Sequence, residues 1–301
     1  MKNGIAAEII NLPCSTSEKE NRPIDGFDLI TILGLMKEYN RQEIWKRYGP
    51  TGHPGRSISL YVGSDYYFLE MHVQQMQRII LSEKFNTNPF FMQQVVQRIT
   101  ASHDHDLIME KIRQQGIDTG YNPIYLSCSM GNTIIDLIVN FEASFPKTGE
   151  VPLGRTRVER TEHRPLDVYD LSSTLYLCQQ NLTETIFRRY QDQDQDPEAN
   201  TDQLQSEVNI VTRVGDYSVS LNFHCVSTDG EQLIPSPGNA SVATIHQVLQ
   251  RMNFRHAPEL ILDELHSVGL AVTARQLDTQ FTLQRYINNT ALQFKFTRIS
   301  A

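Results

Sequence analysis

The chain has 301 residues, of which 40% are hydrophobic and 21% are charged, and its formal net charge is −8. This length and apolar content suffice for one large domain or two smaller ones with a buried core. The acidic balance, without any block of Lys and Arg, argues against a protein that follows nucleic-acid phosphates, so we expect no nucleic-acid partner.

The apolar runs are too short to cross a bilayer, and Met1 to Glu20 lack the basic start and apolar middle of a secretory signal. We therefore expect a soluble protein of a reducing compartment, the cytoplasm. The cysteines lie far apart and form no Cys-x-x-Cys pair, which predicts free thiols and no structural zinc site: Cys14, Cys128, Cys178 and Cys225.

Composition divides the chain into three expected parts. Residues 1–22 form a polar, flexible tail with few large apolar side chains. Residues 23–229 form the main α+β domain, and residues 230–301 a C-terminal α/β portion that packs on it. The segment Pro235-Ser236-Pro237-Gly238 is the best linker between them. We detect no internal repeat.

Periodicity, caps and turn residues predict the elements of the first half. In chain order these are a helix around 29–39, a strand at 57–62, a helix with the stripe Leu69, Val73, Met76 and Ile80, a helix begun by Asn88 and Pro89, a helix capped by Ser102 that ends near Gly116, a strand at 123–127, and a helix at 132–143.

The second half has the clearest strand patterns. The expected elements are a strand at 166–171, a helix at 173–190, a hairpin at 206–226 turning at Gly215-Asp216, helices near 241–252 and 258–266, and a last hairpin of 280–287 and 291–299. The fold class is therefore α+β, with a helical N-terminal part and a mixed or antiparallel sheet core with late β-hairpins.

Three side-chain patterns carry possible chemistry. His103-Asp104-His105-Asp106 offers metal-type ligands, but only His103 and Asp106 share a helix face, so a polar first turn is the simpler interpretation. Asp192-Gln193-Asp194 has the DxD form of metal-dependent glycosyltransferases, within a solvated Gln/Asp run. A Cys/His/Asp hydrolase could use His163 and either Asp167 or Asp170, with Cys14 or Cys128 as the nucleophile.

A fourth pattern consists of segments in a fixed order. The strand 57–64 contains Leu60-Tyr61-Val62-Gly63, the strand 123–129 ends in Ser127-Cys128-Ser129, a strand is expected at 166–171, and Gln205-Ser206-Glu207 leads into the later hairpin. This arrangement resembles the mono-ADP-ribosyltransferases of the R-S-E class, which occur among bacterial toxins and effectors. Val62 stands where that family has Arg, and Cys128 replaces its middle Thr.

The resemblance implies roles for named residues. Glu207 would be the catalytic carboxylate that stabilises an oxocarbenium-like ribose, and Gln205 would position the acceptor. Ser127 would orient the glutamate. Arg56, Tyr61 and Ser129 would bind NAD, the co-substrate, without a metal. The missing family Arg leaves open an inactive, degenerate member.

Two functions thus remain open from the sequence. One is an ADP-ribosyltransferase-like protein that uses NAD to modify a protein acceptor, a bacterial effector translocated into a host cell. The other is a non-enzymatic protein-interaction module. The sequence does not decide whether the chain is an enzyme.

Overall fold

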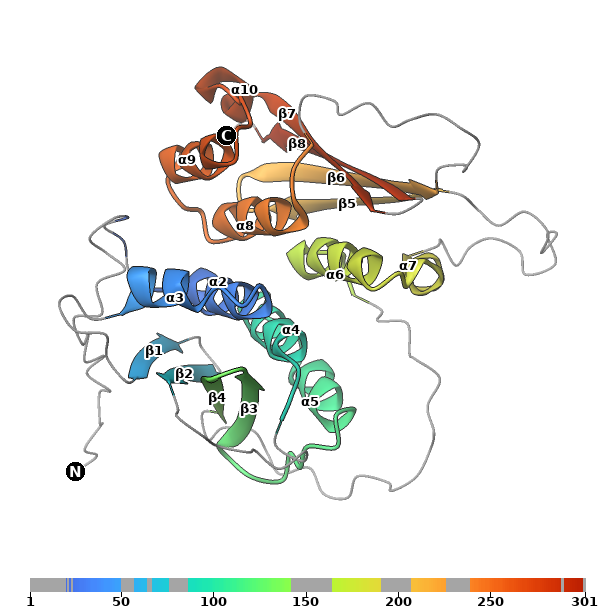
Figure 1. Ribbon diagram of the computed structural model, residues 1–301. Coiled ribbons are helices and arrows are strands. Elements are labelled where there is room, and N and C mark those ends of the chain that lie inside the picture. Colours follow the sequence, from blue (N-terminus) through green and yellow to red (C-terminus); the bar gives the residue numbers. More distant parts are fainter. Residues whose placement is uncertain are drawn as a thin grey trace, which may run out of the picture. The chain divides into compact units, whose positions relative to one another are not determined.

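The computed structural model describes residues 20, 22, 24–49, 57–63, 67–75, 86–141, 164–190, 207–225, 239–287 and 290–299 (Figure 1). The chain forms two compact units, 1–149 and 150–301. We call them unit 1 and unit 2 and describe each by itself.

Unit 1 combines helices with a four-stranded antiparallel sheet of order β1-β2-β4-β3. Its elements, in chain order, are α2 (Gly26–Lys37), α3 (Arg41–Tyr48), β1 (Ser57–Gly63), β2 (Tyr67–Gln75), α4 (Pro89–Thr100), α5 (His105–Arg113), β3 (Ile124–Met130) and β4 (Thr133–Phe141).

Unit 2 has the same order of elements plus one short helix. Its sheet is also four-stranded and antiparallel, with the equivalent order β5-β6-β8-β7. Its elements are α6 (Val168–Gln179), α7 (Thr183–Tyr190), β5 (Glu207–Val214), β6 (Tyr217–Cys225), α8 (Val242–Asn253), α9 (Pro258–Ser267), α10 (Ala274–Asp278), β7 (Gln280–Ile287) and β8 (Thr290–Arg298).

The two units are therefore copies of one architecture, two helices and a hairpin followed by helices and a second hairpin. The expectation that the chain has no internal repeat is wrong. The copies also agree in detail, since each makes a parallel bridge from the segment before its third helix to its third strand: Asn86 to Ser127, and Asn239 to Gln284.

In each unit the helices cover one face of the sheet (Figure 1). Along β2 and β5, for example, buried side chains alternate strictly with partly or fully exposed ones. Burial of one face follows from the period of two in a strand. The opposite side we call the open face of each unit.

A buried ion pair repeats between the units. The guanidinium of Arg22 donates to both carboxylate oxygens of Asp28, at 2.9 Å each. The hydroxyl of Tyr48 donates to the same carboxylate at 3.1 Å. In unit 2, Arg164 donates to Asp170 at 2.9 and 3.0 Å.

The hydroxyl of Tyr190 completes the second copy, donating to Asp170 at 3.1 Å. Burial raises the pKa of Asp28 and of Asp170 above the usual aspartate value, although the neighbouring Arg opposes the shift. Each carboxylate also closes a capping box at the start of its helix, with Asp25 or Asp167 as the N-cap.

A second polar pair repeats at the end of the third helix. Arg98 lies 3.3 Å from Nδ1 of His103, and Arg251 lies 3.4 Å from Nδ1 of His256. Both arginines are 4% exposed. The sequence carries this repeat as Gln-Val-x-Gln-Arg followed by His, at 94–103 and 247–256.

Three predicted elements are wrong in type. Leu69 and Val73 of the expected helical stripe lie in strand β2, whereas Met76 and Ile80 lie outside the described residues. The expected helix at 132–143 is strand β4. The expected strand at 166–171 contains the start of helix α6, because Asp167 caps that helix. The helix expected over 173–190 is two helices, α6 and α7.

Other predictions are confirmed. The α+β class holds, with antiparallel sheets and helices that precede hairpins. Asn88 caps α4 with Pro89 in its first turn, and the hairpins of β5–β6 and β7–β8 occupy the expected segments.

The boundary between unit 1 and unit 2 lies at residue 149. The boundary expected at residue 229 falls inside unit 2, between β6 and α8. The expected tail and the linker at 235–238 lie outside the described residues, apart from Glu20 and Arg22. None of the helices that the structure describes is long and apolar enough to cross a membrane.

Candidate functional site

The predicted site residues are divided between the two units. Ser127, Ser129 and Tyr61 belong to the sheet of unit 1, and Glu207 begins β5 of unit 2. Gln205 and Arg56 lie outside the described residues. The three residues of unit 1 share its open face, with Tyr61 on edge strand β1 and both serines on the opposite edge strand β3.

Ser127 is held by a polar neighbour within its own unit. Its Oγ donates to Oδ1 of Asp136 at 2.6 Å, and its carbonyl accepts from the backbone N–H of Thr87 at 2.7 Å. The backbone N–H of Ser129 donates to the side chain of Asn86 at 3.0 Å. These contacts tie β3 to the segment before α4.

Glu207 is exposed and lies opposite His224 on β6. An exposed carboxylate at a strand end has little effect on the stability of the fold. A role with Ser127 requires residues from both units in one site, and this stays a prediction.

A polar row crosses the open face of unit 1. The register aligns Ser59, His72, Asp136 and Ser127 across all four strands. The Oγ of Ser59 lies 2.8 Å from Nδ1 of His72, and Nε2 of His72 lies 2.6 Å from Oε1 of Glu70. The order hydroxyl, imidazole, carboxylate is that of a nucleophile, its general base and the carboxylate that orients the base.

Acyl transfer at Ser59 would also need donors aimed at a developing oxyanion, and no contact of the described residues supplies them. The row instead fixes the orientation of polar side chains on the sheet surface, since each group satisfies its neighbour.

The adjacent row is aromatic at both edges. The register aligns Tyr61, Glu70, Ile138 and Tyr125. Tyr61 stacks on Phe68 with 5.7 Å between ring centroids, and Tyr125 is 62% exposed. Burial and a hydrogen bond to Glu70 raise the pKa of Tyr61. The strands of this sheet contain no Lys or Arg in their described residues.

Unit 2 has a different chemistry at the equivalent row, where the register aligns Val211, Ser220, Lys295 and Thr282. The aromatic and acidic character is therefore particular to unit 1 and is not required by the shared fold. We call the open face of unit 1 around Tyr61, Phe68, Glu70, Ile138 and Tyr125 the contact surface. Sequence reasoning identified only Tyr61, because the rest depends on strand register.

The other sequence patterns have structural explanations. His105 lies 2.9 Å from the hydroxyl of Tyr67, and His103 pairs with Arg98. The described residues contain no group of three His, Cys, Asp or Glu that could hold a metal ion. The pattern at 192–194 lies outside the described residues.

The described residues of the hydrolase alternative have structural roles or unfavourable protonation. Cys128 is buried, and burial raises the pKa of its thiol to about 12, which disfavours the nucleophilic thiolate. Asp170 is paired with Arg164, and Asp167 caps α6. Cys14 and His163 lie outside the described residues.

Comparisons with known proteins do not add a family to this picture: no protein family, no curated protein and no solved structure matches the chain.

Proposed function

We propose that the protein is a non-enzymatic interaction module and that the contact surface of unit 1 binds a basic polypeptide. The observation that carries this proposal is the difference between equivalent rows of the two sheets. The row in unit 1 contains Tyr61, Glu70 and Tyr125, whereas the row in unit 2 contains Val211, Lys295 and two small polar side chains. Because both units have the same fold with different side chains in this row, the fold itself requires neither group of side chains.

The chemistry of the surface indicates the partner. Tyr side chains give large contact areas with little loss of conformational entropy and are enriched in interfaces. Glu70 and Asp136 provide negative charge, and the described strands of this sheet contain no Lys or Arg. A segment with Lys or Arg beside an apolar side chain would complement this surface.

Photo-crosslinking tests the proposal in the cell that makes the protein. A photoreactive residue at Asn140, which is exposed on β4, should capture a polypeptide with a basic segment. Replacing Tyr125 by Ser should reduce the captured amount about tenfold, since a single aromatic residue can dominate interface energy. Capture should also weaken as the salt concentration rises.

The matched control is Val211→Ser in the equivalent row of unit 2, where Val211 is 55% exposed. It removes an exposed apolar side chain and should leave capture unchanged. Equal capture by wild type and Tyr125→Ser, or equal loss in both variants, would show that the contact surface is not the binding site.

The transferase prediction has a separate test. If the protein is a binding module, it leaves NAD intact, and Glu207→Gln behaves as wild type. Glu259→Gln, another exposed carboxylate in unit 2, is the control. Nicotinamide release by wild type and Glu259→Gln, but not by Glu207→Gln, would establish the transferase and contradict our proposal.

A further inference from the structure

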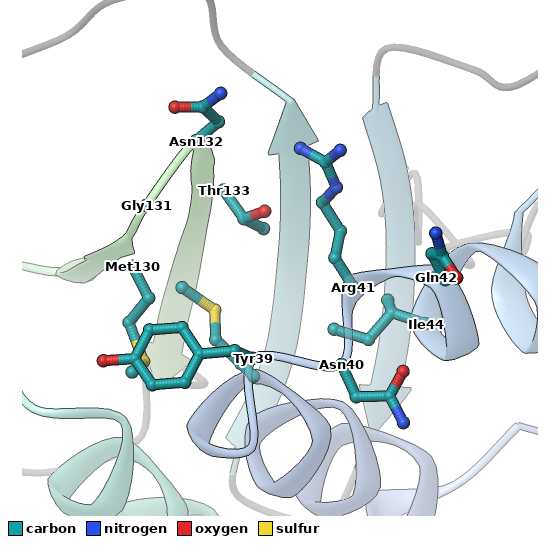
Figure 2. A pocket seen from close by; sticks show the side chains of 10 residues that line it. Tyr39, Asn40, Arg41, Gln42, Ile44, Met130, Gly131, Asn132 and Thr133 are labelled. Atoms are coloured by element: carbon teal, nitrogen blue, oxygen red, sulfur yellow. The ribbon is translucent and has the colours of Figure 1, made fainter.

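A pocket of about 370 Å³ lies in unit 1, between the α2–α3 connection and the β3–β4 turn (Figure 2). This size is within the range of small-molecule sites. Tyr39 and Asn40 of the α2–α3 connection line it together with Arg41 at the start of α3. Asn132 of the β3–β4 turn and Thr133 at the start of β4 line it from the sheet. The pocket shares no residue with the contact surface and is independent of the proposed function.

Two polar groups of the pocket have no partner in the part of the chain that the structure describes. Thr133 is only 5% exposed, yet its hydroxyl makes no hydrogen bond to a described residue. The guanidinium of Arg41 forms no ion pair there either. Figure 2 shows Arg41 on one side of the hollow and Thr133 and Asn132 on the other. A guanidinium and a hydroxyl that line one pocket without a partner among the described residues are available to bind a ligand.

The rest of the pocket is apolar. Met36 and Met130 line it together with Tyr39. Tyr39 is 75% exposed. An exposed aromatic ring next to polarizable thioethers is suited to contact with a flat ring.

The equivalent positions of unit 2 show which residues of this pocket the shared fold requires. In both units the first helix ends in a Schellman motif. The residue in the left-handed conformation is Tyr39 in unit 1, with φ 55°, and Asn181 in unit 2, with φ 59°. Asn tolerates this conformation, whereas a bulky residue is strained there.

The next two positions in the chain also carry different residues in the two units. Leu182 and Thr183 of unit 2 stand where unit 1 has Asn40 and Arg41. The shared fold thus requires neither Arg41 nor Tyr39, and Tyr39 is unfavourable for the backbone. Residues that cost stability and are not needed for packing are expected at binding sites.

We infer that this pocket binds the phosphate of a small molecule that also carries a flat ring, of which a mononucleotide is the simplest kind. Arg41 binds the phosphate oxygens, and Asn132 and Thr133 donate to it from the opposite side. The flat ring of the ligand packs on Tyr39.

Calorimetric titration with adenosine monophosphate, inorganic phosphate and adenosine tests this site on the full chain. The monophosphate should bind more tightly than either part alone. Arg41→Gln should weaken its binding about tenfold or more, through loss of a charge-assisted hydrogen bond. Lys46→Gln makes the same charge change on α3, outside the pocket, and should leave binding unchanged.

Two further variants separate binding from folding. Tyr39→Asn, which introduces the residue of unit 2, should raise thermal stability, weaken binding of the monophosphate about fivefold, and leave phosphate binding unchanged. Thr133→Val should weaken binding of both, whereas Thr290→Val, at the equivalent buried position of unit 2, should weaken neither.

Three results would overturn the inference. The first is the absence of any heat of binding when adenosine monophosphate or phosphate is present at about 10 mM. A dissociation constant above this concentration would be too weak for a specific site of this kind. The second is an equal effect of Arg41→Gln and Lys46→Gln. The third is a loss of stability in Tyr39→Asn without a change in affinity, which would make Tyr39 a structural residue.

Discussion

Replacement of Arg22 by Ala should lower the free energy of unfolding of unit 1 by about 3 kcal/mol, and Arg164→Ala should do the same in unit 2. The side chain of Asp28 is 1% exposed and that of Asp170 is 5% exposed. Without the guanidinium, each carboxylate keeps its tyrosine hydroxyl and a backbone N–H, but its charge stays buried and uncompensated.

The destabilisation of unit 1 by Arg22→Ala should depend on pH. Arg22 lowers the pKa of Asp28, so its removal raises further a pKa that burial already raises. A carboxyl group with a raised pKa in the folded state contributes stability below its unfolded pKa and loses it as pH rises through the folded pKa. The effect of Arg22→Ala is therefore largest at neutral pH and shrinks towards pH of about 4.

Urea unfolding of the full chain at several pH values measures both effects. Arg47→Ala is the control in unit 1, because Arg47 pairs with Glu43 at 2.8 Å on the surface, with side chains 35% and 24% exposed. Such a pair contributes about 0–1 kcal/mol. A loss for Arg22→Ala as small as this, or independent of pH, would show that the buried pair does not stabilise unit 1.

Gly215→Ala should destabilise unit 2 by about 3 kcal/mol, which combines backbone strain with overpacking. Gly215 has φ 58° at the first position of the two-residue turn between β5 and β6. A Cβ at this position would lie 2.1 Å from the carbonyl oxygen of Met252, at the end of α8. The turn or the helix would have to move.

Gly269→Ala separates the two contributions. Gly269 has φ 80°, but a Cβ there would meet no atom within 4 Å. Gly269→Ala should therefore lower the free energy of unfolding by only about 1–2 kcal/mol, through the strain of the left-handed conformation. Chemical denaturation of both variants measures the difference, and equal losses would mean that the approach to Met252 has no cost.

Local signals predicted the fold class and several boundaries. The Asn88-Pro89 cap fixes the start of α4 within a few residues, and alternation along 207–225 predicts the hairpin of unit 2. These signals succeed because caps, turns and period-two patterns act between residues that are close in the chain.

The mistaken helices share a physical cause. Leu69 and Val73 are four residues apart, which fits one face of a helix and also one face of a strand. The stretch Thr133–Phe141 is apolar almost throughout, so it shows no decisive period. Pairing of β2 with β1 and β4 decided the outcome, and that pairing joins residues far apart in the sequence.

The repeat was hidden for a similar reason. Apolar core positions tolerate exchange between residues of similar volume, so the two copies differ at most of them. The identical residues include those of the buried polar pairs, such as Arg22 with Arg164 and Asp28 with Asp170. A buried charge requires a specific partner, whereas an apolar contact does not.

The sequence by itself determined the α+β class, the start of α4 and the later hairpins, because the interactions behind them are local. Only the tertiary structure decided that the chain is a duplicated fold, that Ser127 and Glu207 belong to different units, and that Arg41 and Thr133 line one pocket. Strand register and packing bring these residues together or keep them apart, and both depend on contacts between distant parts of the chain.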